Sequence, residues 1–471
     1  MLKLFDSATR RPEDFHPADG RTALVYSCGP TVYDYAHIGN FRAFICGDIL
    51  CRWLRYHGYE TRQVMNITDV DDKTIAGAAR EGISLSDYTR RYEQAFFEDL
   101  GTLNVQPAWK YPRATEHIPQ MLSMVATLID KGHAYVSEGS VYFDISSFRR
   151  YGMLSGLDTT ARDQGNSFGR LESDQYEREQ VADFVLWKAR KEPDEPAWES
   201  PWGPGRPGWH IECSAMSMEY LGATLDVHNG GVDLRFPHHE NEIAQSEAAT
   251  GKTFVRHWLH SEHLLVDGMK MSKSLGNFYT LRQLLDQGYD PMTIRHQLLT
   301  AHYRKQLNFT LEGLDQSKAA LERLYTFIDR LRKLPLPEGQ SPQVAALCGQ
   351  ARADFAAAMD DDLNVPGAMG ATFELVRQVY PLMEDGKIGT TDRDLILGAL
   401  QDADRVLGLM GTVLAAEASE EDGQIDALVA ERTEARKGRD FARADQIRDE
   451  LDARGIILED GPEGTIWRRK H

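Results

Sequence analysis

A short lysine-rich segment has the side chains of a loop that binds phosphate. It reads Lys270-Met-Ser-Lys273-Ser274 and follows an Asp-Gly turn, so it places two ammonium groups beside two hydroxyls. Fixed positive charge of this kind stabilises the negative charge that develops when pyrophosphate leaves a nucleotide. A solvated cluster of lysines on the surface has the same composition, so this segment alone does not establish a function.

A second segment that suits phosphate joins an apolar run to a helical pattern. It reads Cys28-Gly-Pro-Thr-Val-Tyr-Asp-Tyr-Ala-His37-Ile-Gly39-Asn40 and begins where the apolar run 23–28 ends. The N–H groups at a helix N-terminus bind anions, Gly39 admits a ligand close to the backbone, and His37 and Asn40 each supply a donor. A turn with a capping Asn accounts for these residues equally well. The presence of both segments in one chain predicts an enzyme that acts on the phosphates of ATP.

Four residues at widely separated positions have the side chains of a zinc site. They are Cys28, Cys213, His238 and Glu242, and the last two share a helix face if Pro237 opens a helix. Thiolate, imidazole and carboxylate are all zinc ligands. The sequence has no C-x-x-C pair, however, and on spacing alone buried core cysteines are the better interpretation.

The elements that would position these residues follow an α/β pattern. Residues 23–28 form an apolar run, Ile38–His57 has helical spacing, and Thr61–Asn66 reads as a second strand. A strand–helix–strand order of this kind is a βαβ unit with a right-handed crossover in a parallel sheet. Beyond Asp290 the pattern becomes helical. We therefore expect an α/β protein with a Rossmann-like parallel-sheet catalytic domain and a helical region after it.

Composition shifts along the chain predict several parts. A region rich in Pro, Trp and charge (192–207) indicates an insertion into the sheet domain, and the stretches 334–343 and 416–424 read as linkers. After the second linker, two helices (425–437 and 441–454) and a small hairpin complete an α+β tail. The expected parts are the sheet domain in two halves (1–114 and 208–250), a connective insertion (115–207), a linker region with the lysine segment (251–305), a helical bundle (306–415) and a small C-terminal domain (425–471).

Composition also bears on compartment and partners. No apolar run reaches the roughly 18 residues that span a membrane, and five scattered cysteines do not form a disulfide framework, so we expect a reducing cytoplasm. The net charge of −19 repels a polyanion at long range. Residues 425–471 differ, because they carry 10 basic against 11 acidic residues, and a local basic face there is compatible with this balance.

The longer motifs resemble the cysteinyl-tRNA synthetase family over nearly the whole chain. The two phosphate-binding segments are the two signatures of class I aminoacyl-tRNA synthetases, although Asn40 stands where the class pattern has a second histidine. An Asn amide also donates to phosphate, so we expect little loss. The stretches that carry the resemblance are Cys28-Gly-Pro-Thr-Val-Tyr-Asp34, Asn66-Ile-Thr-Asp-Val-Asp-Asp-Lys73, Gly205-Arg-Pro-Gly-Trp-His-Ile-Glu-Cys-Ser-Ala215 and Phe236-Pro-His-His-Glu-Asn-Glu-Ile243.

The resemblance implies a two-step reaction. L-cysteine reacts with ATP, which carries Mg²⁺, to give cysteinyl-adenylate and pyrophosphate, and cysteine then passes to the terminal ribose of tRNA(Cys). It also implies one zinc ion per chain that selects the substrate thiolate. The implied roles are catalytic for His37, Asn40, Lys270 and Lys273, nucleotide-binding for Gly39, Ser272 and Lys273, cysteine-binding for Gly29, Thr68, Trp209 and Asp233, and zinc-binding for Cys28, Cys213, His238 and Glu242.

The C-terminal third resembles the parts of the family that contact tRNA. The helical region has the bundle signature Asp360-Asp-Asp-Leu-Asn364, and the tail looks like the anticodon reader. In the tail we expect Trp467 to stack on a base and a basic set to contact phosphate, although a solvated helix face with ion pairs explains much of that set equally well. The basic set comprises Arg436, Lys437, Arg439, Arg468, Arg469 and Lys470.

The remaining expectations are a monomer without membrane contact and no assigned role for the other histidines. His228 and His239 are taken as supporting or structural, and His257, His260 and His263 are expected on an exposed element. Two rivals stay open: a mycothiol-type ligase that joins cysteine to an amino sugar, and a non-catalytic, zinc-stabilised RNA-binding relative. The tail argues against the first, and the two phosphate-binding segments argue against the second.

Overall fold

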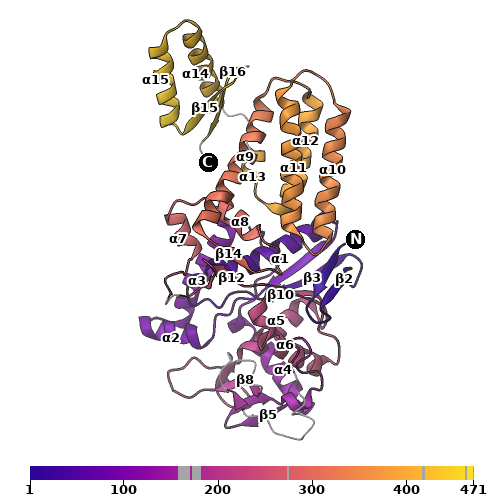
Figure 1. Cartoon of the computed structure of the whole chain (residues 1–471). Coiled ribbons are helices and arrows are strands. Elements are labelled where there is room, and N and C mark those ends of the chain that lie inside the picture. Colours follow the sequence, from indigo (N-terminus) through magenta and orange to yellow (C-terminus); the bar gives the residue numbers. More distant parts are fainter. Residues whose placement is uncertain (158–169, 172–181, 273–274, 416–419, 462–463, 470–471) are drawn as a thin grey trace. The chain divides into compact units, whose positions relative to one another are not determined.

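The computed structural model describes residues 1–157, 170–171, 182–272, 275–415, 420–461 and 464–469 (Figure 1). The chain divides into two compact units, the first made of residues 1–310 and 358–366 and the second of 311–357 and 367–471. Within the described ranges, no helix combines the length and the apolar character needed to cross a bilayer.

The first unit is built on a four-stranded parallel sheet with the strand order β11-β10-β3-β4. Its strands are buried and largely apolar because helices cover a parallel sheet on both faces. The chain runs outward from β3 to β4 and, later, outward from β10 to β11. The strand order therefore reverses between β3 and β10, and ligands of such sheets bind in the crevice at the carboxyl ends of these two strands. The strands are β3 (Thr22–Ser27), β4 (Glu60–Met65), β10 (Leu225–Gly231) and β11 (Val255–Ser261).

Three helices connect the sheet and carry the candidate site. Helix α1 (Ile38–Tyr56) joins β3 to β4, α5 (Trp209–Leu221) leads into β10, and α6 (His238–Thr250) joins β10 to β11. Phe41 and Ile45 of α1 are among the buried residues that the helical spacing indicated. The predicted Rossmann-like parallel sheet is thus confirmed.

The sheet extends past residue 250, where we expected its second half to end. Strand β11 reads Val-Arg-His-Trp-Leu-His-Ser, and its polar letters hid it from a search for apolar runs. His257 and His260 lie on this strand and are buried, so the expectation of an exposed element is wrong for both. His263 follows the strand and is exposed, as expected.

Smaller elements flank the sheet. An N-terminal hairpin precedes it, two helices follow β4, and the expected insertion contributes a helix and a mixed five-stranded sheet whose core also includes Ile211 and Ala244 from α5 and α6. Residues 158–169 and 172–181 of that insertion lie outside the described ranges. These elements are β1 (Lys3–Asp6), β2 (Arg11–Asp14), α2 (Asp72–Glu81), α3 (Leu85–Thr102), η1 (Ala114–Glu116), α4 (Ile118–Asp130), β5 (Ala134–Ser137), β6 (Ser140–Phe143), η2 (Ile145–Ser147), β7 (Arg170–Leu171), β8 (Asp183–Ala189), β9 (Gly205–Pro207) and η4 (Val232–Arg235).

A three-stranded sheet with the order β13-β12-β14 carries the lysine segment. The last residue of β13 is Lys270, and β12 pairs in parallel with β14. Strand β14 interrupts the region beyond Asp290 that the sequence pattern predicted to be helical. The elements are β12 (Leu264–Val266), β13 (Met269–Lys270), α7 (Leu281–Asp286), α8 (Pro291–Leu299) and β14 (Leu307–Phe309).

The second unit is mostly helical and ends in a small α+β module. The module has its own core, in which Ile447 and Trp467 are buried. Its first helix begins at Glu420, before the expected start at 425, because acidic residues favour the first turn of a helix. The helices and strands are α9 (Leu311–Lys333), α10 (Pro342–Asp360), α11 (Val365–Glu384), α12 (Thr390–Leu407), α13 (Gly411–Ala415), α14 (Glu420–Lys437), α15 (Phe441–Ala453), β15 (Ile456–Gly461) and β16 (Gly464–Arg469).

Candidate active site

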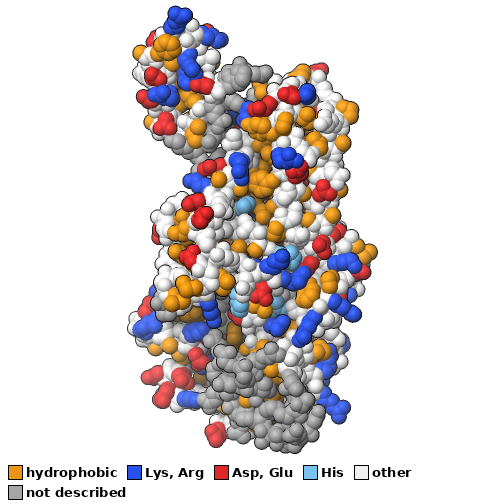
Figure 2. Space-filling view, in the orientation of Figure 1, with side chains coloured by type: hydrophobic (Ala, Val, Ile, Leu, Met, Phe, Trp, Pro, Cys, Tyr) orange, Lys and Arg blue, Asp and Glu red, His pale blue; other side chains and the backbone are white. Residues whose placement is uncertain are grey.

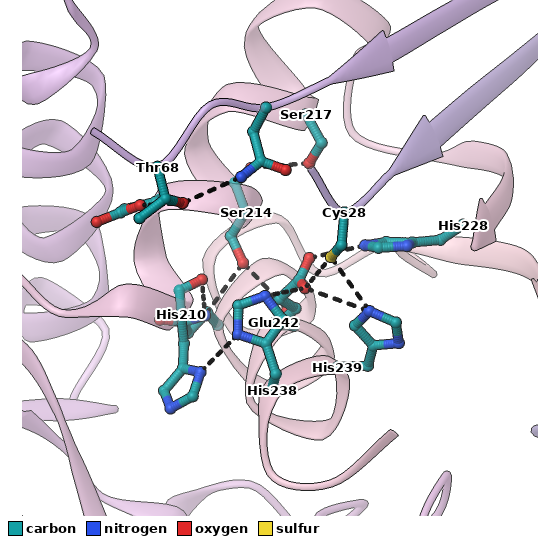
Figure 3. Close-up of polar contacts among 12 residues, drawn as sticks. Cys28, Thr68, His210, Ser214, Ser217, His228, His238, His239 and Glu242 are labelled. Carbon is teal, nitrogen blue, oxygen red and sulfur yellow. Dashed lines mark hydrogen bonds and ion pairs between the residues drawn. The ribbon is translucent and has the colours of Figure 1, made fainter. Parts of the chain in front are cut away.

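The four predicted metal ligands lie together at the reversal point of the sheet. Cys28 follows β3, Cys213 lies on α5, and His238 and Glu242 lie one turn apart on α6. One potential ligand atom from each lies within 4.8 Å of every other. Figure 3 shows the side chains of Cys28, His238 and Glu242 close together. The parallel sheet therefore brings into one group residues that the sequence separates widely.

The donor atoms of this group suit a soft divalent metal. Two sulfurs, an imidazole and a carboxylate form a zinc-type set. The Nε2 atom of His238 is buried 3.1 Å from Glu242 Oε1, but the angle makes no hydrogen bond, and among the described residues this nitrogen has no hydrogen-bond partner. A buried imidazole nitrogen that faces a carboxylate and two thiols is placed as a zinc ligand would be.

Electrostatics within the group favour the ionised forms of Cys213 and Glu242 and the neutral form of Cys28. Burial opposes ionisation of Cys213, but hydrogen bonding with Cys28 and the positive charge of His238 lower the pKa of this thiol to about 6. Burial likewise opposes ionisation of Glu242, but the neighbouring His228 and His238 lower its pKa to about 2. The pKa of the Cys28 thiol is raised well above its usual value by burial and by the adjacent Cys213. The group thus holds negative charge that a cation would neutralise.

A second group of histidines overlaps the first, and sequence reasoning did not find it. His228 and His239 form an alternative set with Cys28 and Glu242, again with ligand atoms within 4.8 Å. His239 Nε2 lies 3.3 Å from Cys28 Sγ, and His228 Nε2 lies 3.0 Å from Glu242 Oε2. His260 on β11 extends the chain, since its Nε2 lies 2.8 Å from His239 Nδ1. Only the pairing of β10 with β11 reveals this chain, because the three histidines have no motif spacing.

The phosphate-type turn caps helix α1. His37 is the N-cap; its Nδ1 accepts from the backbone N–H of Asn40 (3.2 Å), and the amide oxygen of Asn40 accepts from the N–H of His37 (3.1 Å). Asn40 therefore takes part in capping the helix, which was one of the two interpretations that the sequence allowed. The same contacts orient the hydrogen-bond donors of His37 and Asn40. Because Nδ1 accepts, the neutral ring of His37 carries its proton on Nε2, and the Asn40 cap uses only the amide oxygen. Both residues thus keep a donor type that binds phosphate oxygens.

The lysine segment lies against the same turn. A Cβ added to Gly39 would come within 3.3 Å of the Met271 side chain, and the backbone of His37 pairs with that of Thr280. The side chain of Asn277 closes the segment, since it accepts from Ser272 N (2.8 Å) and donates to Lys270 O (3.2 Å). Lys273, the residue on which we expected the strongest effect, lies outside the described ranges together with Ser274.

The predicted cysteine-pocket residues surround the metal-type group. The Trp209 ring lies 4.1 Å from that of His238 between centroids, and the charge of Asp233 acts on the Cys28 thiol. The N–H of Gly29 donates to the side chain of Asn66 (2.8 Å), whose amide donates in turn to Thr68 (3.2 Å).

Thr68 completes a short hydrogen-bonded chain from Gly29 through Asn66. Its hydroxyl donates to Glu212 (3.0 Å), and both residues are buried. Burial raises the pKa of the Glu212 carboxyl well above its usual value, and Cys213 adds to this. Sequence reasoning missed Asn66 and Glu212 as partners, although both stand inside the quoted motifs.

The tail residues are placed differently from what we expected. Trp467 is buried and its indole donates to Asp426 (2.6 Å), so the expectation that it stacks on a base is wrong. Arg436 pairs with Asp460, and Lys437 pairs with Glu434 (2.8 Å). The side chains of Arg468, Arg469 and Lys470 lie outside what the structure describes. The ion-paired interpretation therefore holds for Arg436 and Lys437. On the face shown in Figure 2, acidic and basic side chains are intermixed.

Family models match most of the chain. Residues 14–319 match the class I (C) tRNA synthetase catalytic domain. Residues 354–414 match the DALR domain, and residues 418–468 match the cysteinyl-tRNA ligase anticodon-binding domain.

Curated relatives match over the full length. The chain is 48% identical to a cysteine–tRNA ligase of Brachyspira hyodysenteriae, covering 100% of this chain and 99% of the relative. It is 49% identical to a cysteine–tRNA ligase of Solibacter usitatus, covering 100% of both chains.

Solved structures share the fold at low sequence identity. The methionyl-tRNA synthetase of Mycobacterium tuberculosis in complex with methionyl-adenylate aligns with a TM-score of 0.63 and 15% identity, over 90% of this chain and 96% of that chain. The leucyl-tRNA synthetase of Agrobacterium radiobacter K84, in a ternary complex with tRNA, aligns with a TM-score of 0.59 and 13% identity, over 86% of both chains. These similarities extend to the architecture alone.

Proposed function

This chain belongs to the cysteine–tRNA ligase family of class I aminoacyl-tRNA synthetases, and on that premise we propose how its own residues carry out the reaction. The protein is a ligase, and its reaction joins L-cysteine to tRNA with ATP as the energy source. One observation carries the assignment of residues. Cys28 belongs to the metal-type group and also begins the turn that ends at His37, so thiol recognition and phosphate binding share one loop.

Cys28, Cys213, His238 and Glu242 hold one zinc ion in this proposal. Zinc, when bound there, supplies a preference for a thiolate over a neutral hydroxyl. This preference is needed because shape alone separates near-isosteres such as cysteine and serine by only about a hundredfold. The buried His238 nitrogen 3.1 Å from Glu242 and the lowered pKa of Cys213 support the assignment. His228 and His239 then orient Glu242 and Cys28 from behind.

The remaining pocket residues recognise the backbone of the amino acid. The Asp233 carboxylate pairs with the α-ammonium group, and Trp209 packs over the side chain next to His238. Gly29 lets the substrate approach the main chain, where a larger residue would collide with Asn66. Thr68 supports the pocket floor through its hydrogen bonds.

Activation requires that the carboxylate of cysteine attack the α-phosphate of ATP, which enters as its Mg²⁺ complex. No protein nucleophile is needed, so positioning and electrostatics carry most of the rate enhancement. The donors at the start of α1 bind phosphate oxygens, and the lysine segment stabilises the departing pyrophosphate. The residues assigned to these tasks are His37, Gly39, Asn40, Lys270, Ser272 and Lys273.

Transfer requires that a hydroxyl of the terminal ribose of tRNA(Cys) attack the adenylate carbonyl. The C-terminal module reads the anticodon in this proposal, and Arg436, Lys437 and Arg439 offer charge to phosphate. Arg436 and Lys437 must first exchange their carboxylate partners for phosphate oxygens. We further propose that the protein acts as a monomer in the cytoplasm.

A ligase that joins cysteine to an amino sugar would use the same metal and phosphate residues. The match of residues 418–468 to an anticodon-binding domain favours tRNA as the acceptor, since a sugar acceptor needs no such domain. A non-catalytic RNA-binding relative would not need two phosphate-binding segments held against each other.

The test is ATP–pyrophosphate exchange with each amino acid in turn, followed by a charging assay with tRNA and with an amino sugar. We expect exchange with cysteine and not with serine, and charging of tRNA alone. Cys213→Ala should abolish cysteine-dependent exchange. Cys348→Ala, at a buried cysteine in α10, is the matched control and should leave exchange unchanged. Full activity of the Cys213 variant would refute the metal assignment, and charging of the sugar would refute the acceptor.

A further inference from the structure

Arg42 is buried in the second turn of α1, and its hydrogen bonds within the described part of the chain go to main-chain carbonyls. The residue as a whole is 4% exposed. Nη1 donates to the carbonyls of Glu262 (2.7 Å) and His263 (2.8 Å), and Nη2 donates to those of His302 (3.2 Å) and Lys305. Among the described residues no carboxylate forms an ion pair with this guanidinium. Each terminal nitrogen therefore serves a different segment of chain.

The two segments are the roots of the small sheet that carries the lysine segment. The carbonyls of Glu262 and His263 lie between β11 and β12, and those of His302 and Lys305 lie between α8 and β14. Strand β12 pairs with β14 on one side and with β13 on the other, and β13 ends at Lys270. Arg42 thus fixes the start of the lysine segment to helix α1.

The chain that follows the lysine segment is also held by helix α1. The N–H of Ile38 donates to the carbonyl of Tyr279 (3.1 Å), and His37 pairs with Thr280. Helix α1 and its N-cap therefore contact the chain on both sides of the lysine segment, at residues 262–263 and at residues 279–280. The start of the same helix is the turn that the sequence suggested for phosphate binding.

We infer that Arg42 is a positioning residue for ATP activation, because it holds the root of the lysine segment at a fixed place relative to His37 and Asn40. The inference rests on the proposed function, since it assumes that the two sets of donors act on one nucleotide. A buried charge destabilises a protein unless its geometry is well satisfied, and apolar packing would fill the same space at less cost. What a planar guanidinium adds is a rigid fork that bonds two segments at once, and the single ammonium of a lysine does not reproduce this.

Burial lowers the pKa of Arg42 to about 10, so the side chain keeps its charge at neutral pH. Arg42 therefore does not change its charge in assays run near neutral pH.

The experiment compares Arg42→Lys with Arg52→Lys in the full-length protein. Arg52 is the matched control because it is also a buried arginine of α1, and it donates to Asp48 (2.9 Å) and to the carbonyl of Asn104 (2.6 Å), away from the lysine segment. Cysteine-dependent ATP–pyrophosphate exchange is measured below the melting temperature of each variant. We expect Arg42→Lys to lower kcat about 100-fold and to leave the KM for cysteine within about twofold, because a shift of about 1 Å in reacting groups has this effect. Arg52→Lys should keep kcat within about threefold.

Hydrogen exchange supplies a second measurement that does not depend on activity. Peptides covering residues 264–272 should exchange faster in Arg42→Lys, and in Arg42→Gln as a second variant, than in the wild type and Arg52→Lys. Unchanged exchange rates, an unchanged kcat, or an equal loss in Arg52→Lys would overturn the inference. If the wild type shows no cysteine-dependent activity, the proposed function fails instead, and the hydrogen-exchange comparison still tests the anchoring by Arg42.

Discussion

Gly29→Ala should impair cysteine recognition, because the added Cβ would collide with the main chain of Asn66. An added Cβ would lie 1.7 Å from the carbonyl oxygen of Asn66 and 2.9 Å from its carbonyl carbon. Ordinary contact begins at 3.4 Å, so the two loops must separate by about 1.7 Å, the difference between 3.4 and 1.7 Å. Both colliding atoms belong to the main chain and cannot rotate away as a side chain would. The hydrogen bond from Gly29 N to the Asn66 side chain is lost in the same movement.

The expected loss follows from this displacement. A shift of about 1 Å in a positioned group costs about 100-fold in rate, which is about 2.7 kcal/mol of transition-state stabilisation. Overpacking of this kind also destabilises the fold by about 1–3 kcal/mol. We therefore expect kcat/KM for cysteine in ATP–pyrophosphate exchange to fall at least about 100-fold, with a lower melting temperature.

Gly101→Ala is the matched control for this substitution. Gly101 lies near the end of α3, and an added Cβ there meets nothing within 4 Å. This variant should keep full exchange activity and gain about 0.5–1 kcal/mol of stability, because Ala favours helix more than Gly does. If Gly29→Ala retains kcat/KM within about threefold of the wild type, the loop after β3 is not part of the cysteine pocket. If Gly101→Ala loses as much activity as Gly29→Ala, the loss of activity cannot be attributed to impaired cysteine recognition.

Four further outcomes are expected. Removal of zinc with a chelator should abolish cysteine-dependent exchange and re-addition of zinc should restore it, whereas activity that survives in metal-free protein would contradict the metal assignment. Deletion of residues 425–471 should preserve exchange and weaken tRNA charging at least about tenfold, and intact charging would show that the module does not contact tRNA productively. Asp48→Asn should lower the free energy of unfolding by about 3–5 kcal/mol in urea denaturation, because it leaves the buried Arg52 and Arg295 without their shared carboxylate. Asp354→Asn, at an exposed residue of α10, is the control. An equal effect of both substitutions would contradict the reasoning. Burial lowers the pKa of His296 to about 4, so between about pH 6.5 and 4 the unfolded chain binds a proton that the folded chain does not, and stability falls as the pH drops through this range. His296→Gln should reduce this acid-induced loss of stability by about 2 kcal/mol between pH 7 and 4.5. Identical profiles of stability against pH for the variant and the wild type would contradict the lowered pKa.

The predicted substitutions fall into two groups, one that changes activity and one that changes only stability. In the proposed function, the segment from Cys28 to His37 takes part in both thiol recognition and phosphate binding, so its displacement should affect both. The buried Asp48 group lies further along α1 and supports the helix without contacting the site. Variants there should therefore change stability and leave the KM for cysteine unchanged.

The sequence by itself determined the local features of this protein. Apolar periodicity located β3, α1 and β4 to within a residue or two, since the repeat of a buried strand or helix is written in neighbouring residues. The motifs around Cys28, Asn66, Gly205 and Phe236 identified the family, because their order along the chain needs no knowledge of distance. The capping role of Asn40 was likewise within reach, since a cap involves residues only three apart.

Tertiary structure alone decided the features that depend on distant contacts. Strand β11 escaped prediction because its histidines are buried by pairing with β10 and by polar partners, which no local pattern records. For the same reason His239 and His260 form a chain to Cys28 although their spacing is unremarkable. Trp467 is buried in the core of the small module, whereas Phe441 of the same module is exposed, and the sequence cannot tell a core ring from a stacking platform. The anchoring by Arg42 is the extreme case, because its partners are carbonyl groups that every residue possesses.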